Sequence, residues 1–293
     1  MTFRIAAGRE ARAPAPGALI EGGTKVAPLP GFASVLEIVE GGQNALDRAY
    51  ESIKGSRAAL PRRDVTLLAP IPHPPQMRDF LCFEKHLVQA FGAIGKTPPQ
   101  AWYERPIFYH PNRFSVCGPD AEVPWPAYTE RLDFELEFGC YIGRPGKDIP
   151  KERAREHIFG YTIFNDFSAR DEQAKEMAGQ LGPGKGKDFD NANAMGPCLV
   201  TADELGDPYR LEMLVRVNGE EWGRGNSRDM HWKFEDCIAH ASRSETLHAG
   251  EFFGSGTVGN GCGLEQMRFL KPGDTVELEV EGIGILRNRV VKE

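Results

Sequence analysis

The 293-residue chain has no run of basic residues and no excess of positive charge. It carries 42 Asp and Glu residues against 35 Lys and Arg residues, which gives a formal net charge of −7. An acidic surface repels polyanions, so nucleic acid and anionic membranes are disfavoured as main partners. A local cluster of Arg and Lys would still allow an anionic small molecule to bind. We therefore expect a small-molecule substrate as the partner.

Long apolar runs and paired cysteine motifs are also missing. No stretch approaches the roughly 20 apolar residues that a membrane-spanning helix needs. The segment Met1–Gly17 carries charges where a signal peptide needs an apolar core, so we expect a cytoplasmic protein. The six cysteines are scattered and form no Cys-x-x-Cys motif. This pattern predicts reduced, mostly buried thiols and disfavours both disulfides and a zinc site.

Strand and helix signals alternate irregularly, without the repeated βαβ units of a doubly wound sheet. The proline-rich segment Pro70–Pro75 is incompatible with a helix or a central strand. We place there the boundary between a small N-terminal domain, residues 1–70, and a larger domain, residues 71–293. The larger part is predicted to be rich in β-structure, with helices over 80–94, 151–157 and 171–178 and hairpin turns at Asn218-Gly219 and Glu281-Gly282.

The segment 132–142 is predicted to be a strand because apolar and polar residues alternate strictly. Asp133, Glu135 and Glu137 then share one face of the strand. One interpretation is a half-exposed strand with a solvated acidic face. The other is a cation site, since three like charges on one face repel and a hard cation takes oxygen ligands. The strand alone does not decide between them.

A further acidic residue, Asp166, follows the apolar run 161–164. An unpaired carboxylate at the end of a buried strand costs free energy, which favours a functional role. The alternative is that this segment only starts the next helix, with Ser168 as its cap. Asp79 is likewise able to cap the predicted helix 80–94, and His86 would lie two turns further along the same face. Taken alone, such a histidine is more often a surface or core residue.

Two glycine-rich segments complete the set of candidate site regions. The segment Gly182–Phe189 carries two lysines, but it lacks the spacing of a phosphate-binding Walker A loop. Its simpler interpretation is a solvated loop. The segment Gly254–Glu265 has many glycines, which let backbone N–H groups approach a ligand closely.

In this order, the five segments resemble the fumarylacetoacetate hydrolase family. The resemblance covers roughly residues 70–293 and is specific, because it rests on Asp79 and His86, residues 132–137, residues 160–171, residues 186–189 and residues 255–257. It implies an α+β fold, in which a mixed β-roll catalytic core follows a small N-terminal α/β domain. It also implies a homodimer.

The resemblance further implies the roles of individual residues. A divalent metal would be bound by Asp79, Glu135, Glu137 and Asp166, with Mg2+ preferred and Mn2+ or Ca2+ as alternatives. His86, paired with Glu265, would activate water, and Lys187 would stabilise an oxyanion. The residues expected to contact the substrate are Tyr109, Arg170, Gln173 and Thr257.

The expected activity is hydrolysis of a carbon–carbon bond in a small 1,3-dioxo acid, such as an acylpyruvate or a fumarylacetoacetate-like acid. The bound metal would stabilise the enolate that leaves. Leu81 stands where the long eukaryotic members carry a substrate-contacting tyrosine, so we expect a different acyl group from theirs. The alternatives are a 2-oxo acid decarboxylase, hydratase or isomerase with the same metal site, and a binding protein without activity.

Overall fold

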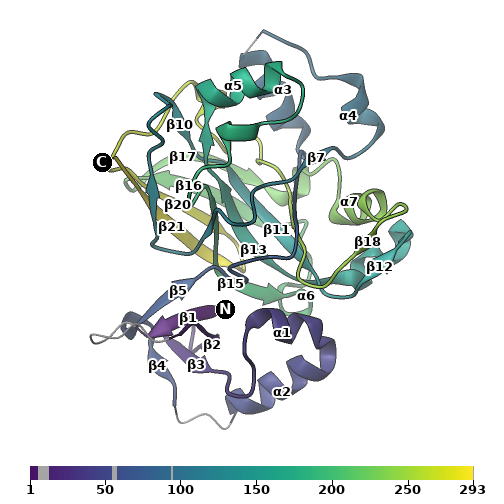
Figure 1. Ribbon diagram of the computed structural model, residues 1–293, viewed down its shortest axis with the longest axis vertical. Helices are drawn as coiled ribbons and strands as arrows, with labels where there is room; N and C mark the ends of the chain where they lie inside the picture. The colour runs from purple at the N-terminus through teal and green to yellow at the C-terminus, as the bar shows by residue number, and fades with distance from the viewer. Residues whose placement is uncertain (6–12, 55–57, 94, 293) are drawn as a thin grey trace.

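The computed structural model describes residues 1–5, 13–54, 58–93 and 95–292. Its fold is α+β, with short helices arranged around three larger sheets (Figure 1). The mixed α+β character expected from the sequence is therefore confirmed.

The N-terminal part is a five-stranded sheet with two helices, drawn in purple and blue at the bottom of Figure 1. The strand order is β4-β3-β2-β1-β5, and all its pairings are antiparallel. The elements are β1 (Thr2–Ile5), β2 (Ala15–Ile20), β3 (Lys25–Pro28), α1 (Val35–Glu40), α2 (Gly42–Lys54), β4 (Leu60–Pro61), the 3-10 helix η1 (Arg62–Asp64) and β5 (Val65–Leu68). The expected domain boundary at residue 70 follows directly after this sheet and stays a prediction.

A seven-stranded mixed sheet runs through the middle of the molecule, in the order β7-β6-β19-β11-β13-β15-β8. The pairs β19–β6 and β15–β8 are parallel, and the other pairs are antiparallel. The strands are β6 (Met77–Phe80), β7 (Phe108–Tyr109), β8 (Val116–Cys117), β11 (Leu136–Ile142), β13 (Ile158–Asp166), β15 (Asn193–Thr201) and β19 (Phe252–Gly254).

A second mixed sheet has the order β17-β16-β20-β21-β9. It consists of β9 (Glu122–Pro124), β16 (Glu212–Val217), β17 (Glu220–Asn226), β20 (Thr275–Val280) and β21 (Gly284–Val291). Asn218 and Gly219 both have positive φ angles, as the predicted two-residue hairpin turn requires. Two-stranded ribbons pair β10 (Leu132–Asp133) with β14 (Ser168–Ala169), and β12 (Gly146–Lys147) with β18 (Thr246–Leu247).

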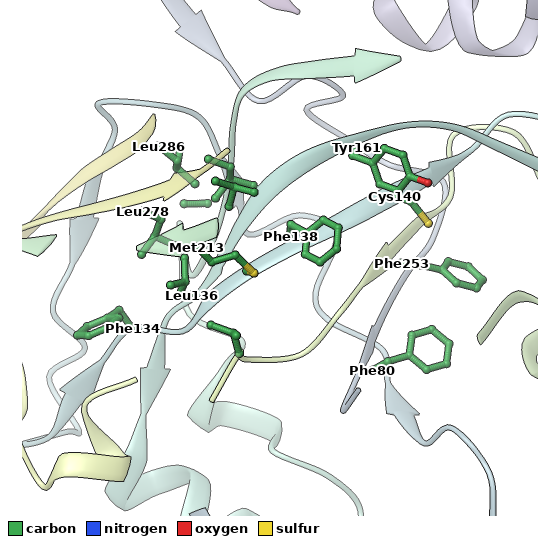
Figure 2. Packing of buried hydrophobic residues seen from close by; sticks show 14 of the residues in the cluster. Phe80, Phe134, Leu136, Phe138, Cys140, Tyr161, Met213, Phe253, Leu278 and Leu286 are labelled. Carbon is green, nitrogen blue, oxygen red and sulfur yellow. The ribbon is translucent and has the colours of Figure 1, made fainter. Parts of the chain in front are cut away.

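The main hydrophobic core joins the two mixed sheets. Leu136 and Phe138 of β11 belong to the same buried cluster as Met213 of β16, Leu278 of β20 and Leu286 of β21 (Figure 2). Every residue of β11 is buried, so this strand is covered on both faces. Polar side chains on β11 must therefore find partners inside the protein.

The remaining helices lie around these sheets. They are α3 (Glu84–Ala93), α4 (Gln100–Glu104), η2 (Lys151–His157), α5 (Arg170–Ala178), η3 (Gly184–Gly186), α6 (Ala202–Leu205), η4 (Ser227–Asp229), α7 (Phe234–Ala241) and η5 (Leu264–Gln266). A smaller cluster packs Val35 and Val39 of α1 against Tyr141 and Phe252 of the seven-stranded sheet. The N-terminal part is thus held to the central sheet by apolar contacts.

The helix expected over 80–94 begins only at Glu84, and Ile94 lies outside the described residues. Residues 77–80 form β6, because this segment pairs with both β19 and β7. The expectation that Asp79 caps the helix was therefore wrong. Sheet pairing outweighed the helical spacing of Phe80 and Phe83, which fits a helix on local pattern alone.

The strand expected over 132–142 is interrupted. Phe134 and Glu135 lie between β10 and β11, which belong to different sheets, and Glu135 forms an isolated bridge with Cys262. Asp133, Glu135 and Glu137 are all buried, which excludes the solvated acidic face. The polar helix expected over 151–157 is the 3-10 helix η2. All six cysteines are free. Within the described ranges, no helix is long and apolar enough to span a membrane.

Candidate active site

Three carboxylates from three strands of the seven-stranded sheet converge in the interior. Asp79 lies on β6, Glu137 on β11 and Asp166 at the end of β13. Each offers a ligand atom within 4.8 Å of those of the other two. Strand β19 lies between β6 and β11, and its Gly254 is opposite Asp79. A Cβ atom on Gly254 would lie 2.4 Å from Asp79 Oδ1, so only glycine leaves room for this carboxylate.

The three carboxylates carry more negative charge than their surroundings balance. Burial and the charge of Asp166 raise the pKa of Asp79 well above its usual value, and burial and Asp79 do the same for Glu137. Burial raises the pKa of Asp166 to about 6, although Lys187 opposes the shift. Glu137 Oε2 and Asp166 Oδ1 are buried without a hydrogen-bond partner. These unpaired oxygens and the converging charges fit a hard divalent cation.

Glu135, the fourth expected metal ligand, is held by cations beside this group. Its Oε2 accepts a hydrogen bond of 2.7 Å from Lys187 Nζ, and its Oε1 lies 2.8 Å from Arg170 Nη1. Burial opposes ionisation of Glu135, but the charges of Lys187 and Arg170 outweigh it and lower its pKa. The structure thus places Glu135 next to the other three carboxylates in ionised form. Its role as a metal ligand stays a prediction.

Lys187 follows η3 and is buried among the carboxylates. It donates to Glu135 and to Asp166. Burial lowers the pKa of a lysine, but here Asp166 and Glu135 outweigh burial and raise it. A fully solvated loop is therefore excluded for this segment: Lys185 is exposed, whereas Lys187 reaches the interior.

Arg170 and Asp133 form a buried pair that the sequence reasoning did not identify. Arg170 Nε donates to Asp133 Oδ2 at 2.8 Å. The same carboxylate accepts hydrogen bonds from the backbone N–H groups of Gly263 and Leu264, at 2.8 and 2.9 Å. Asp133 thereby joins Arg170 to the loop that carries Glu265. The Nη2 atom of Arg170 is buried and has no partner.

His86 and Glu265 lie in contact, as predicted from the sequence. His86 on α3 places Nδ1 3.0 Å from Glu265 Oε1, and Glu265 Oε2 accepts a hydrogen bond from Cys262 N at 3.2 Å. The Glu265 side chain has no exposed surface. With Glu265 as the acceptor of this hydrogen bond, the imidazole of His86 carries its proton on Nδ1 and has Nε2 as an acceptor.

The expected substrate contacts lie in the same buried region and bond to its charged groups. Tyr109 donates to Asp166 Oδ2 at 2.6 Å, and Thr257 Oγ1 donates to Glu137 Oε1 at 3.4 Å. Gln173 accepts from Arg170 Nη1 at 3.0 Å. These four side chains thus contact the charged groups of the site, although Tyr109 and Gln173 are themselves only half-buried. Whether the four bind substrate stays a prediction.

Cys262 is a second residue that the sequence reasoning missed. Its Sγ lies 4.0 Å from His86 Nδ1, and its backbone bridges to Glu135. Cys262 therefore contacts both the His86–Glu265 pair and Glu135. Its place in the glycine-rich segment, three residues before Glu265, was the only available signal.

Sequence comparison identifies one family model. The model described as Fumarylacetoacetate (FAA) hydrolase C-terminal matches residues 76–291. The oxaloacetate tautomerase fahd2 of Xenopus laevis, a mitochondrial protein by name, is 35% identical over 256 residues, which are 87% of this chain and 77% of the relative.

Structural comparison finds the same fold. A fumarylacetoacetate hydrolase from psychrophilic Exiguobacterium antarcticum has a TM-score of 0.78 and 29% identity, covering 100% of this chain and 99% of that one. A maleylpyruvate hydrolase from Sphingobium sp. SYK-6, solved with manganese(II) and pyruvate, has a TM-score of 0.76 and 22% identity over 100% and 99% of the two chains.

Proposed function

The chain belongs to the fumarylacetoacetate hydrolase family, and on that premise we propose that it is a metal-dependent hydrolase that cleaves a carbon–carbon bond in a small 1,3-dioxo acid. The observation that carries this proposal is the His86–Glu265 contact of 3.0 Å beside a group of buried carboxylates. Such a cleavage needs a general base that takes a proton from water and a site that binds a cation.

The cation would be bound by Asp79, Glu137 and Asp166, with Glu135 as the fourth ligand. Mg2+ is our first choice because it takes carboxylate ligands and retains open positions for substrate. Mn2+ and Ca2+ suit the same oxygen donors, and the fold relative with manganese(II) and pyruvate supports Mn2+ as the alternative. When bound, the ion supplies Lewis-acid stabilisation of negative charge on oxygen atoms of the oxo acid.

His86 acts as the general base. Its Nε2 takes a proton from water, and the hydroxide formed attacks the carbonyl carbon remote from the acid end. The resulting imidazolium donates its Nδ1–H to Glu265, whose buried negative charge stabilises it. Cleavage leaves the electron pair on the departing fragment as an enolate, which takes back the proton held on His86. Water is thus consumed and two acids are released.

Lys187 and Arg170 have donors available for the substrate. Lys187 Nζ has three N–H bonds and uses two of them on Glu135 and Asp166. The third stabilises the oxyanion formed by water attack. Arg170 Nη2 is buried without a partner, so a carboxylate of the substrate would satisfy it. Tyr109, Gln173 and Thr257, which bond to Asp166, Arg170 and Glu137, would contact the substrate beside these donors.

A second candidate is isomerisation of a 2-oxo acid, the tautomerisation of oxaloacetate being the nearest case. The 35% identical Xenopus laevis protein is named an oxaloacetate tautomerase. The same His86 would move a proton between carbon and oxygen without adding water. A decarboxylase or hydratase would use the same carboxylates.

The homodimer and the cytoplasmic location stay predictions.

The test is a parallel assay of wild type and His86→Ala on a panel of acylpyruvates and on oxaloacetate, with and without EDTA. Loss of enol absorbance reports cleavage or tautomerisation, and pyruvate release from an acylpyruvate separates the two. We expect EDTA-sensitive release of pyruvate that His86→Ala lacks. Tautomerisation without product release would replace the hydrolase by the second candidate, and full activity after rigorous metal removal would contradict both. A protein that only binds oxo acids would turn over nothing.

A further inference from the structure

A second cluster of side chains able to hold a metal lies outside the cluster formed by Asp79, Glu137 and Asp166. His86, Cys262 and Glu265 each offer a ligand atom, and these atoms lie within 4.8 Å of one another. His86 Nδ1 is 4.0 Å from Cys262 Sγ and 3.0 Å from Glu265 Oε1. We propose that these three side chains form a second metal site, which takes a thiophilic divalent ion such as Zn2+ or Cd2+.

The distances already approach those of a tetrahedral site. Zn–S bonds of about 2.3 Å and Zn–N and Zn–O bonds of about 2.0–2.1 Å put neighbouring ligand atoms roughly 3.3–3.6 Å apart. The sulfur would therefore move about half an ångström toward His86 Nδ1, and the carboxylate oxygen would move away by slightly less. Shifts of this size need only small side-chain rotations.

Charge and ligand softness favour such an ion over Mg2+ at this place. A thiolate and a carboxylate together contribute two negative charges, which balance one divalent cation in a buried site. Sulfur and imidazole ligands select Zn2+ and similar ions, whereas the all-oxygen group of Asp79, Glu137 and Asp166 selects harder ones. Burial raises the pKa of the Cys262 thiol, so the incoming ion must displace its proton.

The surface is close to this cluster on one side. Cys262 and Glu265 lie in the loop around η5, and the next residues, Gln266, Met267 and Arg268, are exposed.

Occupancy of this site would block the proposed general base. Without the ion, the imidazole proton is on Nδ1 and Cys262 carries its thiol proton. With the ion on Nδ1, the ring proton has to be on Nε2, and the thiol proton is released to solvent. Nε2 can then no longer take a proton from water. This consequence rests on the proposed function, whereas binding of the ion rests only on the three side chains.

The binding test uses the full chain saturated with Mg2+ and titrated with Cd2+. A sulfur-to-cadmium charge-transfer band in the ultraviolet reports thiolate coordination, and Mg2+ keeps the all-oxygen group occupied. We expect one equivalent of Cd2+ to produce the band in wild type, and Cys262→Ala to abolish it. The matched control is Cys198→Ala, which removes the half-buried thiol and should keep the band.

Glu265→Gln retains the thiol and provides a second variant should Cys262→Ala fold poorly. We expect its Cd2+ affinity to be at least tenfold lower. An absent band in wild type, or an undiminished band in Cys262→Ala, would overturn the site. Inhibition by Zn2+ is then measured in the turnover assay, where Cys262→Ala should raise the half-inhibiting concentration at least tenfold. If no substrate is turned over while the band is present, the proposed function fails and the metal site stands.

Discussion

The imidazole of His86 and the carboxylate of Glu265 meet at 3.0 Å although 179 residues separate them in the sequence. Helix α3 supplies the histidine, and a loop fixed by Asp133 supplies the glutamate. Gly263 is required in this loop, because an added Cβ would lie 1.9 Å from the carbonyl oxygen of Arg268. The His86–Glu265 contact therefore depends on the tight turn at Gly263 and on the buried Asp133, which holds the loop in place.

Glu265→Gln should abolish most of the turnover. Glutamine keeps the shape but loses the charge that stabilises the imidazolium, so we expect kcat to fall by roughly 10²-fold or more. Steady-state kinetics on the best acylpyruvate measures the loss, and the exposed Glu40→Gln is the matched control. A variant with unchanged kcat would refute the role of Glu265.

Asp79→Asn should remove the stabilisation that a metal provides. At about 100 times its dissociation constant, a bound ion contributes about 2.7 kcal/mol, which corresponds to about 4–5 °C in Tm for a chain of this size. The metal-free variant should be at least as stable as metal-free wild type, because burial and Asp166 disfavour the ionised form of Asp79 and asparagine has no such form. Thermal unfolding with EDTA or Mg2+ tests both points, with the exposed Asp203→Asn as control. A retained metal-induced shift would contradict the ligand role.

Gly254→Ala should weaken metal binding without replacing any of the proposed ligands. The new methyl group would lie 2.4 Å from Asp79 Oδ1, so this carboxylate has to move. We expect metal affinity, measured by calorimetry, to fall about tenfold or more. Gly92→Ala is the matched control. The added methyl group would meet no neighbouring atom within 4 Å, and Gly92 lies in α3, where alanine favours the helix. Equal metal affinity in both variants would contradict the steric argument.

Lys187→Met should destabilise the fold by about 3–5 kcal/mol, because it leaves Glu135 and Asp166 without their shared cation. Adding Glu135→Gln removes one uncompensated charge and should recover part of this loss. Urea unfolding of the single and double variants measures the coupling. Strictly additive losses would show that Lys187 and Glu135 act independently.

Arg170→Lys keeps the charge but loses the planar group that serves Asp133 and Glu135 together. If the free Nη2 binds a substrate carboxylate, KM should rise about tenfold, or about 1.4 kcal/mol, with a smaller change in kcat. With the methyl ester of the same substrate, Arg170→Lys and wild type should have similar KM values. An equal loss on acid and ester would assign Arg170 a structural role only, and exposed Arg63→Lys serves as the control.

The sequence and its family resemblance indicated which side chains lie near one another better than they indicated the elements that carry them. The α+β class, the Asn218-Gly219 hairpin and the His86–Glu265 contact were all expected. Asp79 was expected to cap a helix rather than to lie in a strand, because its partner strand β19 lies 173 residues further along, counting from Asp79 to Phe252. Local periodicity contains no information about such a partner.

The segment 132–137 shows the same limit at the level of side chains. Alternation correctly placed Asp133, Glu135 and Glu137 away from the apolar residues, but it implied that they share one environment. In the structure, Asp133 accepts hydrogen bonds from Arg170 and the η5 loop, and Glu135 pairs with Lys187 and Arg170. Glu137 belongs to the cluster that it forms with Asp79 and Asp166. The break between β10 and β11 separates them, and this break arises from pairing with residues distant in sequence.

The position of β19 between β6 and β11 has a consequence for synthesis on the ribosome. Asp79 and Glu137 emerge early, but the strand that sets their separation ends at Gly254. A nascent chain that stops before this strand has these two proposed ligands without their spacing. The proposed site would therefore gain its metal affinity late in translation, and a truncated chain that lacks residues 252–293 should lose a bound ion to any competing chelator.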